Sequence, residues 1–301
     1  MPTIYPPKGQ VTLRTLLADN PSTQSLKRGD VGSDLIRFDF ADIAVAHDGF
    51  KPFVRDGAFD CGELAIVTFL QARQFGKPLV LLPAVILGRF QHHCLAYNAE
   101  KGAVAPGDLE GKRIAVRSYT QTTGVWVRGI LQNEYGVDPA KVHWVCFDDP
   151  HVAEYTDPAF VERAPKGKKP AQMLLDGEVD AAILGNDMPN DPRIHTVIPD
   201  PQNAALAWHA KTGVVPMNHM VAINADLSAQ RPDVVRDLYR QFKESRDRDT
   251  PPKGGIEVRP FGLEAMRASL QAAIDYAHQQ RIITDKPAVE DLFDDVTRTL
   301  D

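Results

Sequence analysis

Hydrophobic residues along the chain follow two spacings: short apolar runs typical of buried strands, and longer stripes at helical spacing. The run 79–87 lies between Pro78 and Gly88 and has the continuous apolar character of a strand buried on both faces. The predicted strands are Val11–Leu17, Leu35–Ala44, Leu79–Leu87, His92–Asn98, Lys112–Arg117, Lys141–Phe147, Val179–Leu184 and Val214–Ile223. The predicted helices are Phe50–Arg55, Cys61–Gln74, Val125–Tyr135 and Pro170–Asp176. Strands that alternate with helices predict an α/β protein with parallel sheet.

The strand–helix series restarts in the middle of the chain, at the turn Asp108–Gly111, and three amphipathic stripes (232–242, 263–277 and 289–300) predict closing helices. A series that restarts predicts two lobes, with chain crossings near Ala96–Lys101 and Pro201–Thr212. Lobe 1 would comprise residues 1–97 and 205–301, and lobe 2 residues 98–204. A ligand is then expected in the crevice between the lobes, at the carboxyl ends of strands.

Composition narrows the classes of function. The chain has 301 residues and a net charge of -6, so it lacks the basic surface that nucleic-acid binding needs. Its three cysteines, Cys61, Cys94 and Cys146, form no CxxC motif and indicate a reducing compartment. The sequence has no secretory leader and no apolar run of about 18 residues, so a cytoplasmic location and no membrane partner are expected.

The clearest local signal is the segment Lys112–Arg128, in which a strand runs through a polar stretch directly into a helix. Five of the six residues of that stretch carry hydroxyl groups; it consists of Ser118, Tyr119, Thr120, Gln121, Thr122 and Thr123. The unpaired N–H groups and partial positive charge of a helix start can hold a carboxylate or phosphate. The simpler interpretation is that Thr122 or Thr123 caps the helix. Capping does not require so many hydroxyls, so a ligand site is favoured.

This same region carries a resemblance to a known family. The run Asp108–Val137 resembles the 4,5-dihydroxyphthalate decarboxylase family, as do Phe53–Leu70, Arg89–Tyr97 and Pro216–His219. That family is part of the periplasmic-binding-protein-like (type 2) superfamily, which also contains sulfonate-binding proteins and thiamine-precursor synthases. The resemblance implies a two-lobed α/β fold with two hinge crossings. It also implies a lyase of aromatic compound degradation that removes one carboxylate from a dihydroxylated phthalate, leaving a dihydroxybenzoate and carbon dioxide.

Such a reaction needs a proton donor for the ring carbon and a cationic or N–H clamp for the carboxylate that stays. Arg89 is a candidate clamp, because a guanidinium binds a carboxylate through two hydrogen bonds. His92 and His93 are candidate proton carriers. On the predicted strand they point to opposite faces, whereas Arg89 and His93 point the same way. A structural hydrogen bond is the alternative role for these histidines.

Two further candidates lie elsewhere in the chain. Glu63 stands at a predicted helix start, where its negative charge is placed favourably against the helix dipole; as a functional group it would accept a ring hydroxyl proton or orient a histidine. His219 lies on the predicted strand that returns through the hinge and is expected to approach His92 or His93. These three histidines and Glu63 have the ligand types for a divalent metal, but no HxH, HxxxH or HExxH spacing occurs, so no cofactor is expected.

Asn186 and Asp187 follow a predicted strand of lobe 2, which makes them either ligand-binding residues or an ordinary turn. Trp126 is expected to pack in the core, and Arg128 to point away from the helix start. Two segments depart from the family pattern: Gln24 stands where an arginine is expected, and Ala46–Pro52 replaces a more aromatic and acidic segment. The substrate therefore stays open among aromatic carboxylates. A solute receptor for an aromatic or sulfonated anion is the main alternative, a different enzyme on this fold is the next, and the number of subunits stays open.

Overall fold

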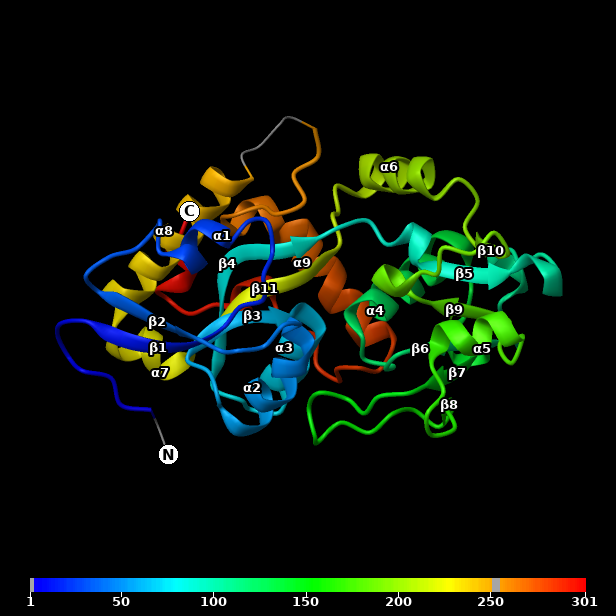
Figure 1. Cartoon of the computed structure of the whole chain (residues 1–301), viewed down its shortest axis with the longest axis horizontal. Helices are drawn as coiled ribbons and strands as arrows, with labels where there is room; N and C mark the ends of the chain where they lie inside the picture. Colours follow the sequence, from blue (N-terminus) through cyan, green and yellow to red (C-terminus); the bar gives the residue numbers. More distant parts are fainter. Residues whose placement is uncertain (1–2, 251–254) are drawn as a thin grey trace. The chain divides into compact units, whose positions relative to one another are not determined.

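The computed structural model describes residues 3–250 and 255–301, which form two α/β units, each with its own sheet (Figure 1). Of these residues, unit 1 takes those up to 89, those between 217 and 271 and those from 287 onward. Unit 2 takes residues 90–216 and 272–286. Two α/β units are what the alternating pattern predicts. Within the described residues, no helix combines the length and the apolar character that crossing a membrane requires.

Unit 1 is built on a five-stranded sheet with the order β2-β1-β3-β11-β4. Its strands are β1 (Val11–Leu16), β2 (Ile36–Phe40), β3 (Cys61–Ala65), β4 (Leu79–Gly88) and β11 (Met217–Asn224). Strand β1 runs parallel to β2 and β3, whereas β11 is antiparallel to both of its neighbours, β3 and β4. Strand β11 comes from the part of the chain that returns to unit 1 after unit 2. It is inserted between β3 and β4, as Figure 1 shows.

Helices pack on the unit 1 sheet and bury its apolar side chains. They are α1 (Gln24–Arg28), α2 (Phe50–Asp56), α3 (Ile66–Gln74), α7 (Ala225–Gln230), α8 (Pro232–Asp249) and the first part of α9 (Leu263–Gln279). The stripe predicted after Pro232 faces the core: Val235, Leu238 and Phe242 are buried with Leu13 of β1. The spacing of those residues at about 3.6 positions is what lets one face of α8 cover the sheet.

Unit 2 is built on a six-stranded sheet with the order β10-β5-β9-β6-β7-β8. Its strands are β5 (Leu95–Asn98), β6 (Arg113–Val116), β7 (His143–Cys146), β8 (Val161–Arg163), β9 (Ala181–Ile183) and β10 (Ile194–Thr196). Its helices are α4 (Thr122–Tyr135), α5 (Pro170–Asp176), α6 (Pro201–Thr212) and the end of α9. Strands β6, β7, β8 and β9 pair in parallel, β5 is antiparallel to β9, and the edge strand β10 is antiparallel to β5.

Two predicted elements near the candidate site are wrong. The segment predicted as one helix over Cys61–Gln74 begins with the fully buried strand β3, and helix α3 starts only at Ile66. Pairing with β1 and β11 determines this outcome, because a buried five-residue segment such as CGELA has no clear strand or helix periodicity of its own. The predicted strand His92–Asn98 begins instead with a 3-10 turn, His92–Cys94, and only Leu95–Asn98 is strand.

Two predictions in the second half of the chain also differ from the structure. Residues 201–212, expected to be a crossing, form helix α6, whose start has an N-cap at Asp200 followed by Pro201. The last predicted helix is instead a pair of short 3-10 helices, Val289–Leu292 and Thr297–Thr299. The carboxylate of Asp294 accepts the backbone N–H groups of Val296 and Thr297, and this local turn interrupts the helix.

The boundaries between the units lie at 89/90 and 216/217, whereas the sequence suggested changes after residues 97 and 204. Strand β5 pairs with β9 and β10, which assigns residues 95–98 to unit 2. Residues 272–286 also lie in unit 2, so helix α9 has residues in both units. Hydrophobic spacing alone does not reveal such an insertion, because the apolar stripe of α9 is continuous.

Candidate functional site

Glu63 and His219 form a carboxylate–imidazole pair within unit 1. His219 Nδ1 lies 2.9 Å from Glu63 Oε2, and the Glu63 side chain is 4% exposed while that of His219 is 20% exposed. The register of β3 and β11 explains this contact. Val221 is paired with Glu63, and residues two positions apart on a strand share a face, so His219 is the diagonal neighbour of Glu63.

The surroundings of this pair fix its protonation pattern. Glu63 Oε1 accepts the backbone N–H of Ala18 at 2.6 Å, so both carboxylate oxygens are engaged. A carboxylate oxygen that accepts this hydrogen bond takes it from Nδ1–H, which leaves Nε2 as the ring nitrogen that can exchange a proton. The ring of Phe50 meets the His219 ring edge-on at 5.1 Å between centroids. The arrangement holds one imidazole in a fixed tautomer and orientation, as a proton carrier requires.

Glu63 contacts a histidine, and its role in orienting that histidine stays a prediction. Glu63 lies in strand β3, so it does not oppose a helix dipole as the other interpretation required. Gly62 beside it has φ of +153°, and a Cβ there would lie 2.2 Å from the carbonyl oxygen of Leu16. A glycine within a buried segment is a sequence signal for such a close approach of two strands. The sequence interpretation did not use this signal.

The candidate residues near the first predicted chain crossing, Arg89, His92 and His93, differ from one another in their surroundings. Arg89 is half-buried directly after β4, at the end of the first segment of unit 1. His92 and His93 lie in unit 2 on the 3-10 turn, so the argument that placed Arg89 and His93 on one face of a strand is wrong. His93 is exposed, and its Nε2 lies 3.6 Å from the sulfur of Cys94. The predicted approach of His219 to His92 or His93 stays a prediction.

His92 is 2% exposed and lies edge-on to Trp208, with 5.4 Å between ring centroids. Burial lowers the pKa of His92 to about 4, and the neighbouring His93 acts in the same direction. The imidazole is therefore neutral at pH 7. It lines a pocket of about 290 Å³ together with the ion pair of Glu134 and Lys211. A neutral imidazole can hold a hydrogen bond there, but it is a poor proton donor at this pH.

The hydroxyl-rich stretch lies where the sequence predicted, at the start of helix α4. The helix begins at Thr122, three residues earlier than predicted, and Gln121 occupies the N-cap position without a side-chain cap. Ser118, Thr120, Thr122 and Thr123 are all buried, and Ser118 Oγ lies 3.3 Å from Thr120 Oγ1. Neither Thr122 nor Thr123 caps the helix, so the capping interpretation of these hydroxyls is wrong. The stretch brings several small donors to one helix start.

Tyr119 and Trp126 are core residues of unit 2. The Tyr119 hydroxyl donates to the carbonyl oxygen of Gln280, and its ring packs edge-on against Trp144. Trp126 is 1% exposed and meets Tyr276 edge-on, as its expected core role requires. Asp187 is exposed at the turn after β9, and the side chain of Asn186 lies outside what the structure describes.

Arg128 was missed by the sequence interpretation, which expected it to point away from the start of α4. Its side chain is fully buried, and Nη2 donates to the carbonyl oxygen of Tyr119 before the helix. Long side chains on a helix lean toward its N-terminus, and a Cβ on Gly124 would lie only 3.0 Å from Arg128 Nη1. A glycine four residues before the arginine was the available signal.

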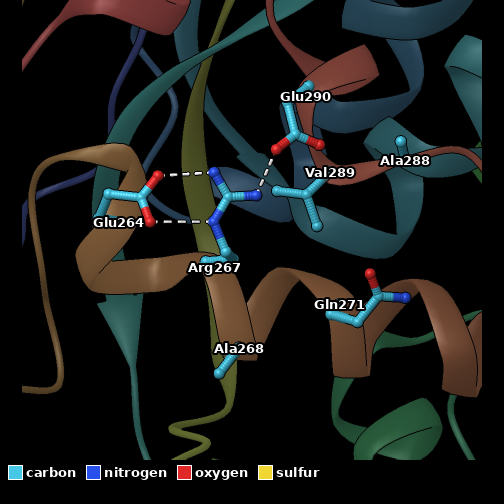
Figure 2. A pocket seen from close by; sticks show the side chains of 7 residues that line it. All are labelled: Glu264, Arg267, Ala268, Gln271, Ala288, Val289 and Glu290. Carbon is cyan, nitrogen blue, oxygen red and sulfur yellow. Dashed lines mark hydrogen bonds and ion pairs between the residues drawn. The ribbon is translucent and has the colours of Figure 1, made fainter.

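A larger surface pocket of about 550 Å³ lies in unit 1 and contains none of the predicted residues. Figure 2 shows Arg267 between two carboxylates, with Glu264 on one side and Glu290 on the other. The guanidinium is therefore already engaged by acids of the protein itself, which leaves little charge for a ligand. Over residues 3–250 and 255–301, no group of three or more His, Cys, Asp or Glu side chains is arranged to hold a metal ion.

Comparison with known proteins gives matches in sequence and in structure. No protein-family model matches the chain. It is 30% identical over 216 residues to the 4,5-dihydroxyphthalate decarboxylase of Comamonas testosteroni, covering 65% of this chain and 63% of that protein. It is 29% identical over 173 residues to the enzyme of the same name from Pseudomonas putida, covering 53% and 66%. The match thus spans slightly less than two thirds of each relative.

Among solved structures, the alkanesulfonate-binding protein SsuA from Xanthomonas axonopodis pv. citri, bound to MOPS, superposes with a TM-score of 0.56. The sequence identity is 14%, and the superposition covers 95% of this chain and 99% of that one. The chain therefore has the α/β fold of periplasmic solute-binding proteins, as predicted. The predicted resemblance to the 4,5-dihydroxyphthalate decarboxylases is confirmed at the level of sequence similarity.

Proposed function

We propose that this protein is a carboxy-lyase that removes a carboxylate from a hydroxylated aromatic acid such as 4,5-dihydroxyphthalate. The observation that carries the proposal is the pair of His219 and Glu63, 2.9 Å apart and anchored to the backbone of Ala18. The similarity to two curated decarboxylases of that substrate supports the choice of reaction.

The reaction replaces a ring C–CO2⁻ bond with a ring C–H bond and releases carbon dioxide, so one proton must reach the ring carbon. In 4,5-dihydroxyphthalate a hydroxyl lies para to a carboxylate, and its deprotonation pushes electron density onto the carbon that accepts the proton. The neutral Nε2 of His219 can take a proton from such a hydroxyl, and the imidazolium can return one. Glu63 stabilises the imidazolium and keeps Nδ1 protonated.

The substrate carboxylates need a fixed electropositive partner while the ring charge changes. Within unit 2, the start of α4 has N–H groups and the buried hydroxyls of Ser118, Thr120 and Thr122, which are groups that suit a carboxylate. Arg89 is assigned to the second carboxylate on the chemistry of its guanidinium. The ring of Tyr119 is engaged by its neighbours in unit 2, so no ligand contact is assigned to it.

The alternative function is a solute-binding protein for an aromatic or sulfonated anion, which the superposition with an alkanesulfonate-binding protein favours. One assay separates the two functions. The purified protein is incubated with hydroxylated phthalates and benzoates, and carbon dioxide and the ultraviolet spectrum are followed. Release of carbon dioxide with one equivalent of 3,4-dihydroxybenzoate from 4,5-dihydroxyphthalate is expected. Tight binding of these acids without release would favour the solute-binding alternative. Cytoplasmic location, the absence of a cofactor and the subunit number stay predictions.

A further inference from the structure

Arg128 is a buried cation that has no acidic partner in hydrogen-bond contact among the described residues of unit 2. Its Nε donates to Gln280 Oε1 at 2.6 Å, and Nη2 donates to the Tyr119 carbonyl oxygen, so both acceptors are neutral. The guanidinium stacks over the Tyr119 ring at 4.2 Å from the centroid. Its Nη1 is buried without a hydrogen-bond partner within the described part of the chain. A buried guanidinium without an acidic partner destabilises the folded protein unless an anion compensates its charge.

The acid whose charge acts on Arg128 is Asp157, which binds Arg163 through Oδ2, while its Oδ1 is buried without a hydrogen-bond partner among the described residues. Asp157 forms an ion pair with Arg163 at 2.6 Å, and burial raises the pKa of its carboxyl. Tyr155 and Cys146 also face this cluster, and burial raises the pKa of both, which keeps them neutral at pH 7. Asp157 thus acts on Arg128 through its charge, whereas the hydrogen bonds of Arg128 go to neutral acceptors.

The guanidinium lies beside the first turns of α4, because it contacts Tyr119 before the helix and Gly124 within it. Its charge adds to the partial positive charge of the helix start. The hydroxyl of Thr122, the first residue of the helix, is buried and likewise has no hydrogen-bond partner in the described residues. Three buried polar groups without hydrogen-bond partners in the described residues thus occur at one helix start: Arg128 Nη1, the Thr122 hydroxyl and Gln121 Oε1. The first two can donate a hydrogen bond to an anion.

We propose that Arg128 is a positioning residue that gives the start of α4 its preference for an anion, with the bound anion acting as the counter-charge of its guanidinium. This inference rests on the proposed function, in which the same helix start holds a substrate carboxylate. The ligand class is an aromatic carboxylate or sulfonate, in preference to a neutral compound of the same shape. Arg128 itself acts through the helix start, and Gln280 holds its guanidinium in place.

Three substitutions test the charge of Arg128 separately from its shape. Arg128→Met removes the charge, and Arg128→Lys keeps it without the planar fork. Gln280→Glu leaves Arg128 in place but puts a carboxylate against its Nε, which supplies the counter-charge from within the protein. That carboxylate also faces the carbonyl oxygen of Val125, so the unfolding temperature is measured alongside. Gln279→Glu is the matched control, since it changes the net charge equally on the exposed neighbouring residue.

Dissociation constants for phthalate, benzenesulfonate and neutral phthalamide are measured by calorimetry on the full chain. We expect Arg128→Met and Gln280→Glu to weaken phthalate and benzenesulfonate about tenfold or more while phthalamide is unaffected. Arg128→Lys should recover most of the anion affinity, and Gln279→Glu should match wild type. If Arg128→Met does not fold, Gln280→Glu decides the question.

Wild-type affinity for phthalate in the folded variants would overturn the role of Arg128 and leave the proposed function intact. An equal loss for phthalate and phthalamide would also overturn it, because a purely structural role predicts that result. Failure of the wild-type protein to bind either anion would overturn this inference, whereas the proposed function is judged by carbon dioxide release from 4,5-dihydroxyphthalate.

Discussion

The ring of Phe50 meets the imidazole of His219 at 86°, with 5.1 Å between the ring centroids. Phe50 is the first residue of helix α2, so this helix restrains the side chain of His219, which is carried by β11. An edge-on contact of this kind fixes the plane of the imidazole beyond what its single bond to Glu63 achieves.

Replacement of Phe50 by leucine should lower kcat about tenfold with little change in KM, because the imidazole loses its lateral support. The matched control is Phe53→Leu, since Phe53 lies in the same helix, is equally buried at 1% exposed and contacts Phe59 instead. Both variants should lose similar stability, by about 1–2 kcal/mol. Steady-state kinetics and urea denaturation measure the two effects, and equal kcat for both variants would count against the role of Phe50.

Glu63→Gln should lower kcat by about 100-fold or more while substrate affinity changes little. A glutamine has one oxygen for two donors, the Ala18 N–H and His219 Nδ1, so one of them loses its acceptor. The control is Glu244→Gln, an exposed carboxylate that pairs with Arg240 on α8. Kinetics at saturating substrate decide the matter: a Glu63→Gln enzyme as fast as the control would mean that the carboxylate does not orient the histidine.

The free energy of unfolding should fall at acid pH, and His92 should account for part of that fall. Its pKa is lowered from 6.5 to about 4 in the folded protein, so the unfolded chain binds more protons between these values. The free energy of unfolding contributed by this group should therefore decrease as the pH falls from 6.5 to 4, by about 3 kcal/mol at most.

The variant His92→Gln should lack that part of the pH dependence, as measured by urea denaturation at several pH values. His195→Gln removes an exposed histidine of strand β10 and should keep the wild-type slope. If His92→Gln and wild type lose the same free energy between pH 6.5 and 4, His92 is not the buried neutral group described above.

Gly62→Ala should destabilise the protein by roughly 3 kcal/mol or more, because a Cβ would lie 2.2 Å from the Leu16 carbonyl oxygen and φ is +153°. Gly57→Ala is the control: its φ is also positive, at +60°, but no atom lies within 4 Å of the added carbon. That variant should lose only about 1 kcal/mol. Similar denaturation midpoints for the two variants would show that β3 tolerates separation from β1.

Much of the fold could be predicted from the sequence where an element has a clear hydrophobic pattern of its own. Strand β4 and helices α2 and α5 lie within a residue of their predicted ranges, because apolar runs and glycine or proline boundaries specify them locally. Strand β3 could not be predicted in this way, because five buried residues fit a helix equally well until β1 and β11 pair with them. The division of α9 between the two units could not be predicted either, because its apolar stripe is continuous.

The candidate site shows a similar division. The hydroxyl-rich start of α4 was predicted from a contiguous stretch of sequence. The pair of Glu63 and His219 was only half predicted, because the residues are 156 positions apart and their contact depends on the register of β11. Arg128 was missed because its environment depends on Gln280, which is 152 positions away.

The central claim is that His219, oriented by Glu63, carries the proton that replaces the departing carboxylate. The most direct measurement is single-turnover release of carbon dioxide from 4,5-dihydroxyphthalate by wild type and His219→Gln, with the dissociation constant of the substrate determined in parallel. We predict that His219→Gln releases carbon dioxide at least about 100-fold more slowly while binding the substrate with nearly wild-type affinity. Release at the wild-type rate by the variant would contradict the account.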